Sequence, residues 1–182
     1  TKKSVSKFIL RTNFAASQLM HPLGDYAAKT LKYKRVVTIA MDNPFGHEEI
    51  GGFQRVFEDR GGRVVQKIWV PLNALDFAPY LTQVGKDADA VCAVFVAAQG
   101  VRFIKQYAEY GLKARLPLIG SGGMTDEHVI RTLGDEAVGA RGALLQAPPR
   151  PPPDNRTYMR LAAAKVGATP AYLPALLYTA RG

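Results

Sequence analysis

The chain is predicted to be an α/β protein with an open parallel sheet that carries helices on both faces. Apolar runs of strand length alternate along its 182 residues with stretches that repeat apolar residues at helical spacing. The strand-like runs are apolar almost throughout, which is typical of parallel strands covered on both faces. Right-handed crossovers would then place the carboxyl ends of these strands at one edge of the sheet.

The first strand-and-helix unit supports this prediction most directly. Residues 36–39 are Val-Val-Thr-Ile, and the run ends at residues 42–44, Asp-Asn-Pro, which favour a turn. A helix with an apolar stripe is expected to begin at Gly46 and to end before Gly61-Gly62. Glu48 and Glu49 fall in its first turn, where carboxylates interact favourably with the helix dipole.

The other elements continue the alternation. A polar lead-in over residues 1–16 precedes a helix at 24–33, and Asp76 and Thr125 are expected to be N-caps. Further strands are expected at 63–70, 90–96, 117–119 and 142–146, and further helices at 77–84, 99–110 and 126–133.

A proline-rich stretch divides the chain near its end. Residues 147–155 contain five prolines, which favour an extended, stiff connection between lobes rather than a packed loop. Helices are expected after it at 158–166 and 171–180. The second of these is apolar and almost uncharged, so it needs another surface to cover it.

Composition narrows the function classes. Eight of the 24 Lys and Arg and one of the 15 Asp and Glu lie in residues 1–35, which therefore carry +7 of the net charge of +9. This local excess lacks the interleaved aromatic residues that stack on bases, so nucleic-acid binding is not predicted. The single Cys92 lies in an apolar run and is interpreted as a packing residue. No apolar run approaches the length of a membrane span.

The motifs do not predict an enzyme. His47-Glu48-Glu49-Ile50-Gly51 lacks the second His of a zinc-binding helix, so no metal site is expected. The glycine cluster at residues 120–125 has neither the length of a nucleotide-binding loop nor a Lys for a phosphate. No catalytic residue and no cofactor are therefore predicted.

The loops after the first, third and fourth strands would meet at one edge of the sheet. These loops, residues 42–46, 97–100 and 120–125, are small and polar, and they could form one wall of a ligand cleft. The alternative is that Phe45 is a core residue and that the glycines serve only the turns. The residues predicted to line this wall are Asn43, Phe45, Gly46, Ala97, Gln99, Ser121, Gly122 and Met124.

Several stretches occur in an order that matches a known family. They are Phe-Ile-Leu-Arg-Thr-Asn at 8–13, Asp-x-x-Phe-Gly at 42–46, Asp76-Phe77, the run from Phe103 to Lys113, Pro-Leu-Ile-Gly-Ser-Gly-Gly at 117–123 and Leu-Gly-Asp-Glu-Ala-Val-Gly-Ala-Arg-Gly at 133–142. Together they resemble the substrate-binding proteins of branched-chain amino-acid type (Leu/Ile/Val-binding) ABC transporters. The resemblance extends over residues 8–180.

This resemblance implies a two-lobed type I periplasmic binding protein that binds a small molecule between its lobes and delivers it to an ABC permease. Residues 1–11 would be the lead-in between lobes, 12–147 the second lobe, 148–153 the crossover and 154–182 helices of an incomplete first lobe. Such a fragment would self-associate through its uncovered apolar helices, and its signal sequence would lie outside the chain. The alternative function is that of a ligand-sensing domain of a signalling receptor with the same fold.

Two departures from the family pattern concern the ligand. The resemblance places Gly122 where amino-acid binders carry the carboxylate that pairs with the ligand ammonium. A buried ammonium without a partner is costly, so an amino acid would fit this site poorly. Phe45 replaces the usual Tyr and keeps the ring without its hydroxyl. Both changes favour an aromatic or aliphatic carboxylate.

Overall fold

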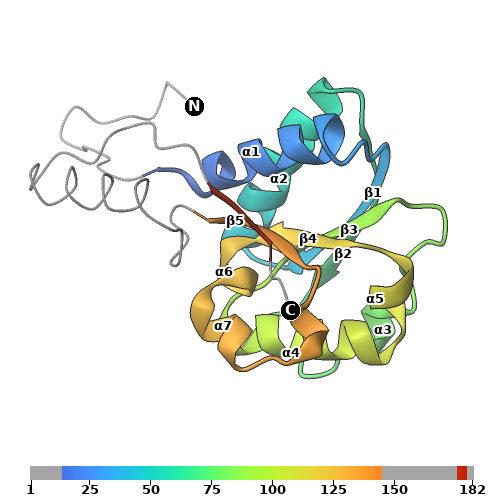
Figure 1. Ribbon diagram of the computed structural model, residues 1–182, viewed down its shortest axis with the longest axis vertical. Helices are drawn as coiled ribbons and strands as arrows, with labels where there is room; N and C mark the ends of the chain where they lie inside the picture. Colours follow the sequence, from blue (N-terminus) through green and yellow to red (C-terminus); the bar gives the residue numbers. More distant parts are fainter. Residues whose placement is uncertain (1–13, 145–175, 180–182) are drawn as a thin grey trace, which may run out of the picture.

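A computed structural model describes residues 14–144 and 176–179 as one sheet with helices on both faces (Figure 1). The strand order is β2-β1-β3-β4-β5-β6, and β1 to β5 are parallel, whereas β6 is antiparallel to β5. The predicted open parallel α/β sheet is therefore confirmed. The strands are β1 Arg35–Met41, β2 Arg63–Val70, β3 Ala90–Val94, β4 Leu118–Ser121, β5 Arg141–Leu144 and β6 Leu176–Thr179.

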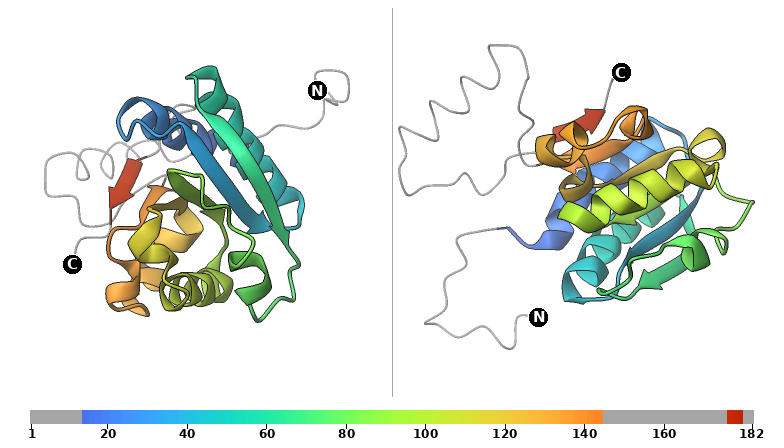
Figure 2. Two further views of the ribbon diagram at one scale, coloured as in Figure 1. Left: turned by 90° about the vertical axis from the view of Figure 1, so that its right-hand side faces the viewer. Right: turned by 90° about the horizontal axis from the view of Figure 1, so that it is seen from below.

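The helices form two layers, one on each face of the sheet (Figure 2). One layer is α1 Ala16–Lys29 and α2 Pro44–Asp59; the other is α3 Ala78–Leu81, α4 Ala97–Glu109, α5 Leu112–Arg115, α6 Gly122–Thr125 and α7 Glu127–Arg131. Val36 and Cys92 belong to the core under α1 and α2, whereas Val37 and Val91 belong to the core under α4. This alternation follows from the two-residue period of a strand, and it requires apolar residues on both faces.

Helix α2 begins two residues before the predicted start. The Asn43 side chain accepts a hydrogen bond from the Gly46 N–H at 2.8 Å and so caps the helix. Pro44 occupies the first turn, where its missing N–H costs nothing.

Helix α1 differs more from its prediction. It covers residues 16–29 rather than 24–33, and Pro22 lies inside it. Met20 and Leu23 are fully buried in the same core as Phe53 and Phe57 of α2. Because this packing stabilises the helix, it outweighs the hydrogen bond that Pro22 cannot make.

The cap predicted at Thr125 is wrong by one residue. Thr125 ends the short helix α6, and the Asp126 carboxylate accepts a hydrogen bond from the Val129 N–H at 2.9 Å as the cap of α7. A carboxylate at this position also interacts favourably with the α7 dipole. The cap predicted at Asp76 is also wrong by one residue, because Phe77 is the N-cap of α3; the Asp76 carboxylate, one residue earlier, accepts a hydrogen bond from the Ala78 N–H at 2.9 Å.

The helix predicted at 171–180 is wrong for residues 176–179, which form strand β6 and pair with β5. Pro174 has no N–H to donate to such a helix, and the open edge of β5 offers unpaired backbone groups. Residues 176–179 thus join this sheet, whereas the predicted self-association through apolar helices stays a prediction. The predicted segments 1–11, 148–153 and 158–166 lie outside the described residues.

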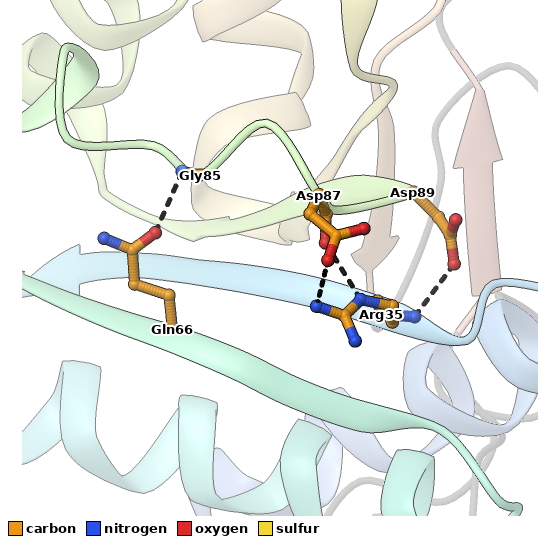
Figure 3. Close-up of polar contacts among 5 residues, drawn as sticks. All are labelled: Arg35, Gln66, Gly85, Asp87 and Asp89. Carbon is orange, nitrogen blue, oxygen red and sulfur yellow. Dashed lines mark hydrogen bonds and ion pairs between the residues drawn. The ribbon is translucent and has the colours of Figure 1, made fainter.

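Polar contacts hold the amino edge of the sheet, opposite the predicted ligand loops (Figure 3). The Asp89 carboxylate accepts from the backbone N–H of Arg35 at 2.8 Å, and the Arg35 guanidinium donates to the Asp87 carboxylate at 2.5 Å. On the neighbouring strand, Gln66 Oε1 accepts from the Gly85 N–H at 3.0 Å. These contacts order the segment that enters β3 and leave the carboxyl edge to a separate set of loops.

Candidate functional site

The carboxyl ends of β1, β3 and β4 lie side by side because the three strands are parallel neighbours. The segments that follow them are residues 42–46, 95–100 and 122–125, and each leads into a helix. We call this the carboxyl edge. In open α/β sheets ligands bind at this edge.

Two of the predicted wall residues are exposed at the carboxyl edge. The Phe45 side chain is 36% exposed, so the interpretation of Phe45 as a core residue is wrong. Ala97 is also exposed, at the first position of α4. Gln99 is half-buried, and its amide donates a hydrogen bond to the Leu72 carbonyl at 2.5 Å. Its side chain therefore ties the loop after β2 to α4.

The other predicted residues mostly support the loops from within. Ser121 and Met124 are each 1% exposed, so their side chains do not reach the surface of a wall. Gly46 is buried, and a Cβ added there would lie 2.1 Å from the Met41 carbonyl oxygen. Asn43 caps α2 as described above. Gly122 is partly exposed at the start of α6.

The loop after β2 also contributes to the carboxyl edge, although the sequence analysis did not predict it. Leu72 and Leu75 are 56% and 68% exposed, and Val96, directly after β3, is 38% exposed. Since β2 is parallel to β1, this loop opens on the same edge. Val96 is the last residue of the strand predicted over residues 90–96, and its position beside the predicted ligand loop at 97–100 was the signal that could have identified it.

A shallow groove of about 730 Å³ runs from the carboxyl edge between α4 and the α6–α7 segment. Val96, Ala97 and Gly123 are among its lining residues, and Arg102 and Asp126 supply its charges. The Asp126 carboxylate caps α7, whereas Arg102 is a cation at the groove. The site is thus largely apolar, with a few polar groups of the kind that orient a small ligand.

Glu49 is the buried carboxyl beneath this edge. It was predicted to lie in an ordinary first turn, but its side chain is 2% exposed. Burial raises the pKa of Glu49 to about 8; a hydrogen bond with Ser121 opposes this rise, and the Glu48 carboxylate adds to it. Glu49 is four residues before Phe53 on the buried stripe of α2, which explains why it points inward.

Ala97 has a left-handed backbone conformation, with φ of +48°. This conformation costs a residue with a Cβ roughly 1–2 kcal/mol. We expect Ala97→Gly to raise the free energy of unfolding by about 0.5–1 kcal/mol, because glycine adopts positive φ readily. Thermal denaturation would measure the change. Ala98→Gly, in the next position of the same helix, should instead lower stability by about 0.5–1 kcal/mol, and an equal loss in both variants would contradict the interpretation.

The His47 ring has its own contacts. Its Nε2 lies 2.8 Å from the Asp42 carboxylate, and the ring stacks on Trp69 with centroids 3.8 Å apart.

Within residues 14–144 and 176–179 no group of three or more His, Cys, Asp or Glu residues could hold a metal ion. None of the helices described in these ranges is long and apolar enough to span a membrane.

This architecture is shared with known proteins. Residues 1–180 match the family described as "Periplasmic binding protein". The chain belongs to the periplasmic binding protein family. The resemblance expected from the ordered stretches is therefore confirmed, and membership of this solute-binding family confirms that the chain is not an enzyme.

Several relatives of this binding-protein chain have informative names. It is 30% identical to the Leu/Ile/Val-binding protein homolog 6 of Brucella melitensis over 89% of its length. It is 35% identical to an ABC transporter substrate-binding protein from Sphaerobacter thermophilus over 88% of its length, with a TM-score of 0.78. Two similar structures are ABC transporter solute-binding proteins: one from Rhodopseudomonas palustris BisB5 in complex with 3,4-dihydroxybenzoic acid (35% identity, 85% coverage, TM-score 0.72) and one from R. palustris in complex with benzoate (27%, 91%, 0.73).

The binding-protein chain spans less than half the length of these relatives. It covers 42% of the Brucella protein, 44% of the Sphaerobacter protein, and 43% and 44% of the two Rhodopseudomonas proteins.

Proposed function

We propose that this chain forms one lobe of a two-lobed solute-binding protein of an ABC importer, which acts in the periplasm and delivers its ligand to a membrane permease. Residues 14–144 and 176–179 make a single sheet with its own two cores, as expected of one lobe. The relatives are more than twice as long, which leaves room for a second lobe.

The ligand we favour is a small carboxylate without an amine, above all an aromatic acid. The observation that carries this proposal is the chemistry of the carboxyl edge: Phe45, Leu72 and Val96 are exposed there, and residues 121–125 contain no acidic side chain. The acidic groups nearby are otherwise engaged, since Asp126 caps α7, Asp42 lies 2.8 Å from His47 Nε2 and Glu49 is buried. An ammonium group would therefore lack a partner, whereas an aromatic ring would find apolar contacts.

Within this proposal Phe45 supplies the aromatic contact, and Ala97, Gln99 and Gly122 contribute the adjoining wall. Asn43, Gly46, Ser121 and Met124 support the loops from beneath. The left-handed Ala97 is in keeping with a functional edge, because strained backbone is concentrated at binding sites. The complexes of relatives with benzoate and 3,4-dihydroxybenzoic acid favour the same ligand class.

Calorimetric titration of the full-length protein tests this function. We expect benzoate or 3,4-dihydroxybenzoate to bind and leucine not to bind, and Phe45→Ala to weaken binding of the aromatic acid by about tenfold through loss of the ring contact. Tyr110→Ala is the matched control, because Tyr110 is an aromatic residue 49% exposed at the opposite end of α4. Micromolar binding of leucine would contradict the ligand proposal, and equal effects of the two variants would contradict the role of Phe45.

A further inference from the structure

The loops of the carboxyl edge are linked beneath the surface by a short chain of polar groups. Glu49 on α2 hydrogen-bonds with Ser121 at the end of β4. The Ser121 hydroxyl in turn donates to the Phe95 carbonyl, directly after β3, at 3.4 Å. These hydrogen bonds therefore join α2, which follows β1, to the end of β4 and to the residue directly after β3.

The groups of this hydrogen-bond chain are buried. Glu49 and Ser121 are 2% and 1% exposed, and Glu49 Oε2 has no hydrogen-bond partner. Within the described ranges the other buried side-chain polar atom without a partner is Thr125 Oγ1, which also belongs to this loop region. Buried polar groups normally find partners, so an incomplete set beneath a proposed binding edge calls for an explanation.

We propose that Glu49 is a positioning residue of the ligand site: its buried carboxyl holds the start of α2, which carries Phe45, against the end of β4 and thereby sets the spacing of the ligand loops. Phe45 and Glu49 are separated by four residues and lie on the same side of α2, one at the surface and one beneath it. The inference rests on the proposed solute-binding function and assigns Glu49 a positioning role in that site.

The direction of the hydrogen bonds explains why a neutral carboxyl suits this place. Ser121 has one hydroxyl hydrogen, which it donates to the Phe95 carbonyl, so its oxygen remains free to accept one from Glu49. A neutral carboxyl can donate that hydrogen. A carboxylate can only accept, so it would take the single hydrogen of Ser121 from Phe95; this is the contact that opposes the rise of the Glu49 pKa. Loss of the proton should therefore break the chain and loosen the loops.

The charged and titratable neighbours of Glu49 are few. Glu48 on the same helix and Cys92 of β3 interact with it, and β4 contributes the neutral Ser121. The polar and titratable groups of α1 act elsewhere along α2: Ser17 donates to Glu48, His21 lies near Arg55, and Asp25 pairs with Arg60. None of the cations named here faces Glu49 to stabilise its ionised form.

Amide hydrogen exchange of the full chain at pH 6 and pH 9, corrected for intrinsic rates, tests the proposal without any ligand. If opening of the loop returns Glu49 from a pKa of about 8 to 4.5, the protection of amides at 121–125 should fall by about a hundredfold between these pH values. In Glu49→Gln, whose amide can still donate to Ser121, the protection should be the same at both pH values.

The matched control is Glu48→Gln, which removes the adjacent, exposed carboxylate and should keep most of the pH-dependent loss of protection, because burial, the main cause of the raised Glu49 pKa, is unchanged. Equal loss of protection in Glu49→Gln and the wild type would overturn the proposal, as would a loss spread evenly over the whole chain. Failure of benzoate to bind the full-length protein would count against the proposed function alone, because the exchange measurement does not depend on it.

Discussion

Between pH 6 and pH 9 the free energy of unfolding of the wild-type chain is expected to fall by roughly 2–3 kcal/mol, and Glu49→Gln is expected to abolish this fall. The Glu49 side chain is 2% exposed, and burial raises its pKa from 4.5 to about 8. Glutamine has the same shape and no charge, so the variant should be nearly insensitive to pH at this position.

The sign of the effect follows from proton binding. Below pH 4.5 the carboxyl is protonated in both the folded and the unfolded chain, so it contributes no pH dependence. Between 4.5 and about 8 only the folded chain keeps the proton, so the free energy of unfolding falls as the pH rises. Above about 8 both states are ionised and the dependence ends.

Denaturant titration of both proteins at intervals from pH 5 to pH 9 measures this difference. Subtracting the two curves cancels other groups, such as His21, whose pKa burial lowers and which makes folding more favourable as the pH rises. Glu48→Gln should keep most of the wild-type slope, because burial, the main cause of the raised Glu49 pKa, is unchanged. Parallel curves for the wild type and Glu49→Gln would show that Glu49 is charged in the folded chain.

The sheet was predictable because its strands are marked by local chemistry. Residues 36–39 are β-branched and are followed by Asp-Asn-Pro, and this pattern alone predicts a buried strand and a turn. The two errors in helix position arose where proline was misjudged. Pro22 is tolerated inside α1 by packing against α2, which no local pattern reveals, and Pro174 was overlooked within the helix predicted across it.

The candidate site was predictable in position but less so in detail. Parallel topology alone brings the loops after β1, β3 and β4 to one edge. Which side chains reach the surface depends on packing, so Phe45 is exposed while Met124 is buried. The burial of Glu49 was visible in the spacing of the α2 stripe, but its charge favoured an exposed position.

Gly52→Ala is expected to lower the free energy of unfolding by roughly 3 kcal/mol, because α1 and α2 touch at this residue. A Cβ added to Gly52 would lie 2.2 Å from the Ser17 carbonyl oxygen and 2.7 Å from the Ser17 Cα. These are backbone atoms, so no side chain can rotate away, and the two helices would have to move apart. Thermal or denaturant unfolding would measure the loss.

Gly51→Ala provides the matched control on the same helix. No atom lies within 4 Å of a Cβ added to Gly51, so this variant should gain about 0.5–1 kcal/mol from the higher helix propensity of alanine. Opposite signs at adjacent positions would show that close packing of α1 on α2, rather than helix propensity, requires Gly52. A gain in both variants would mean that the helices can separate freely. Since α2 carries both Phe45 and Glu49, the position of the proposed ligand edge would then not be fixed by this contact.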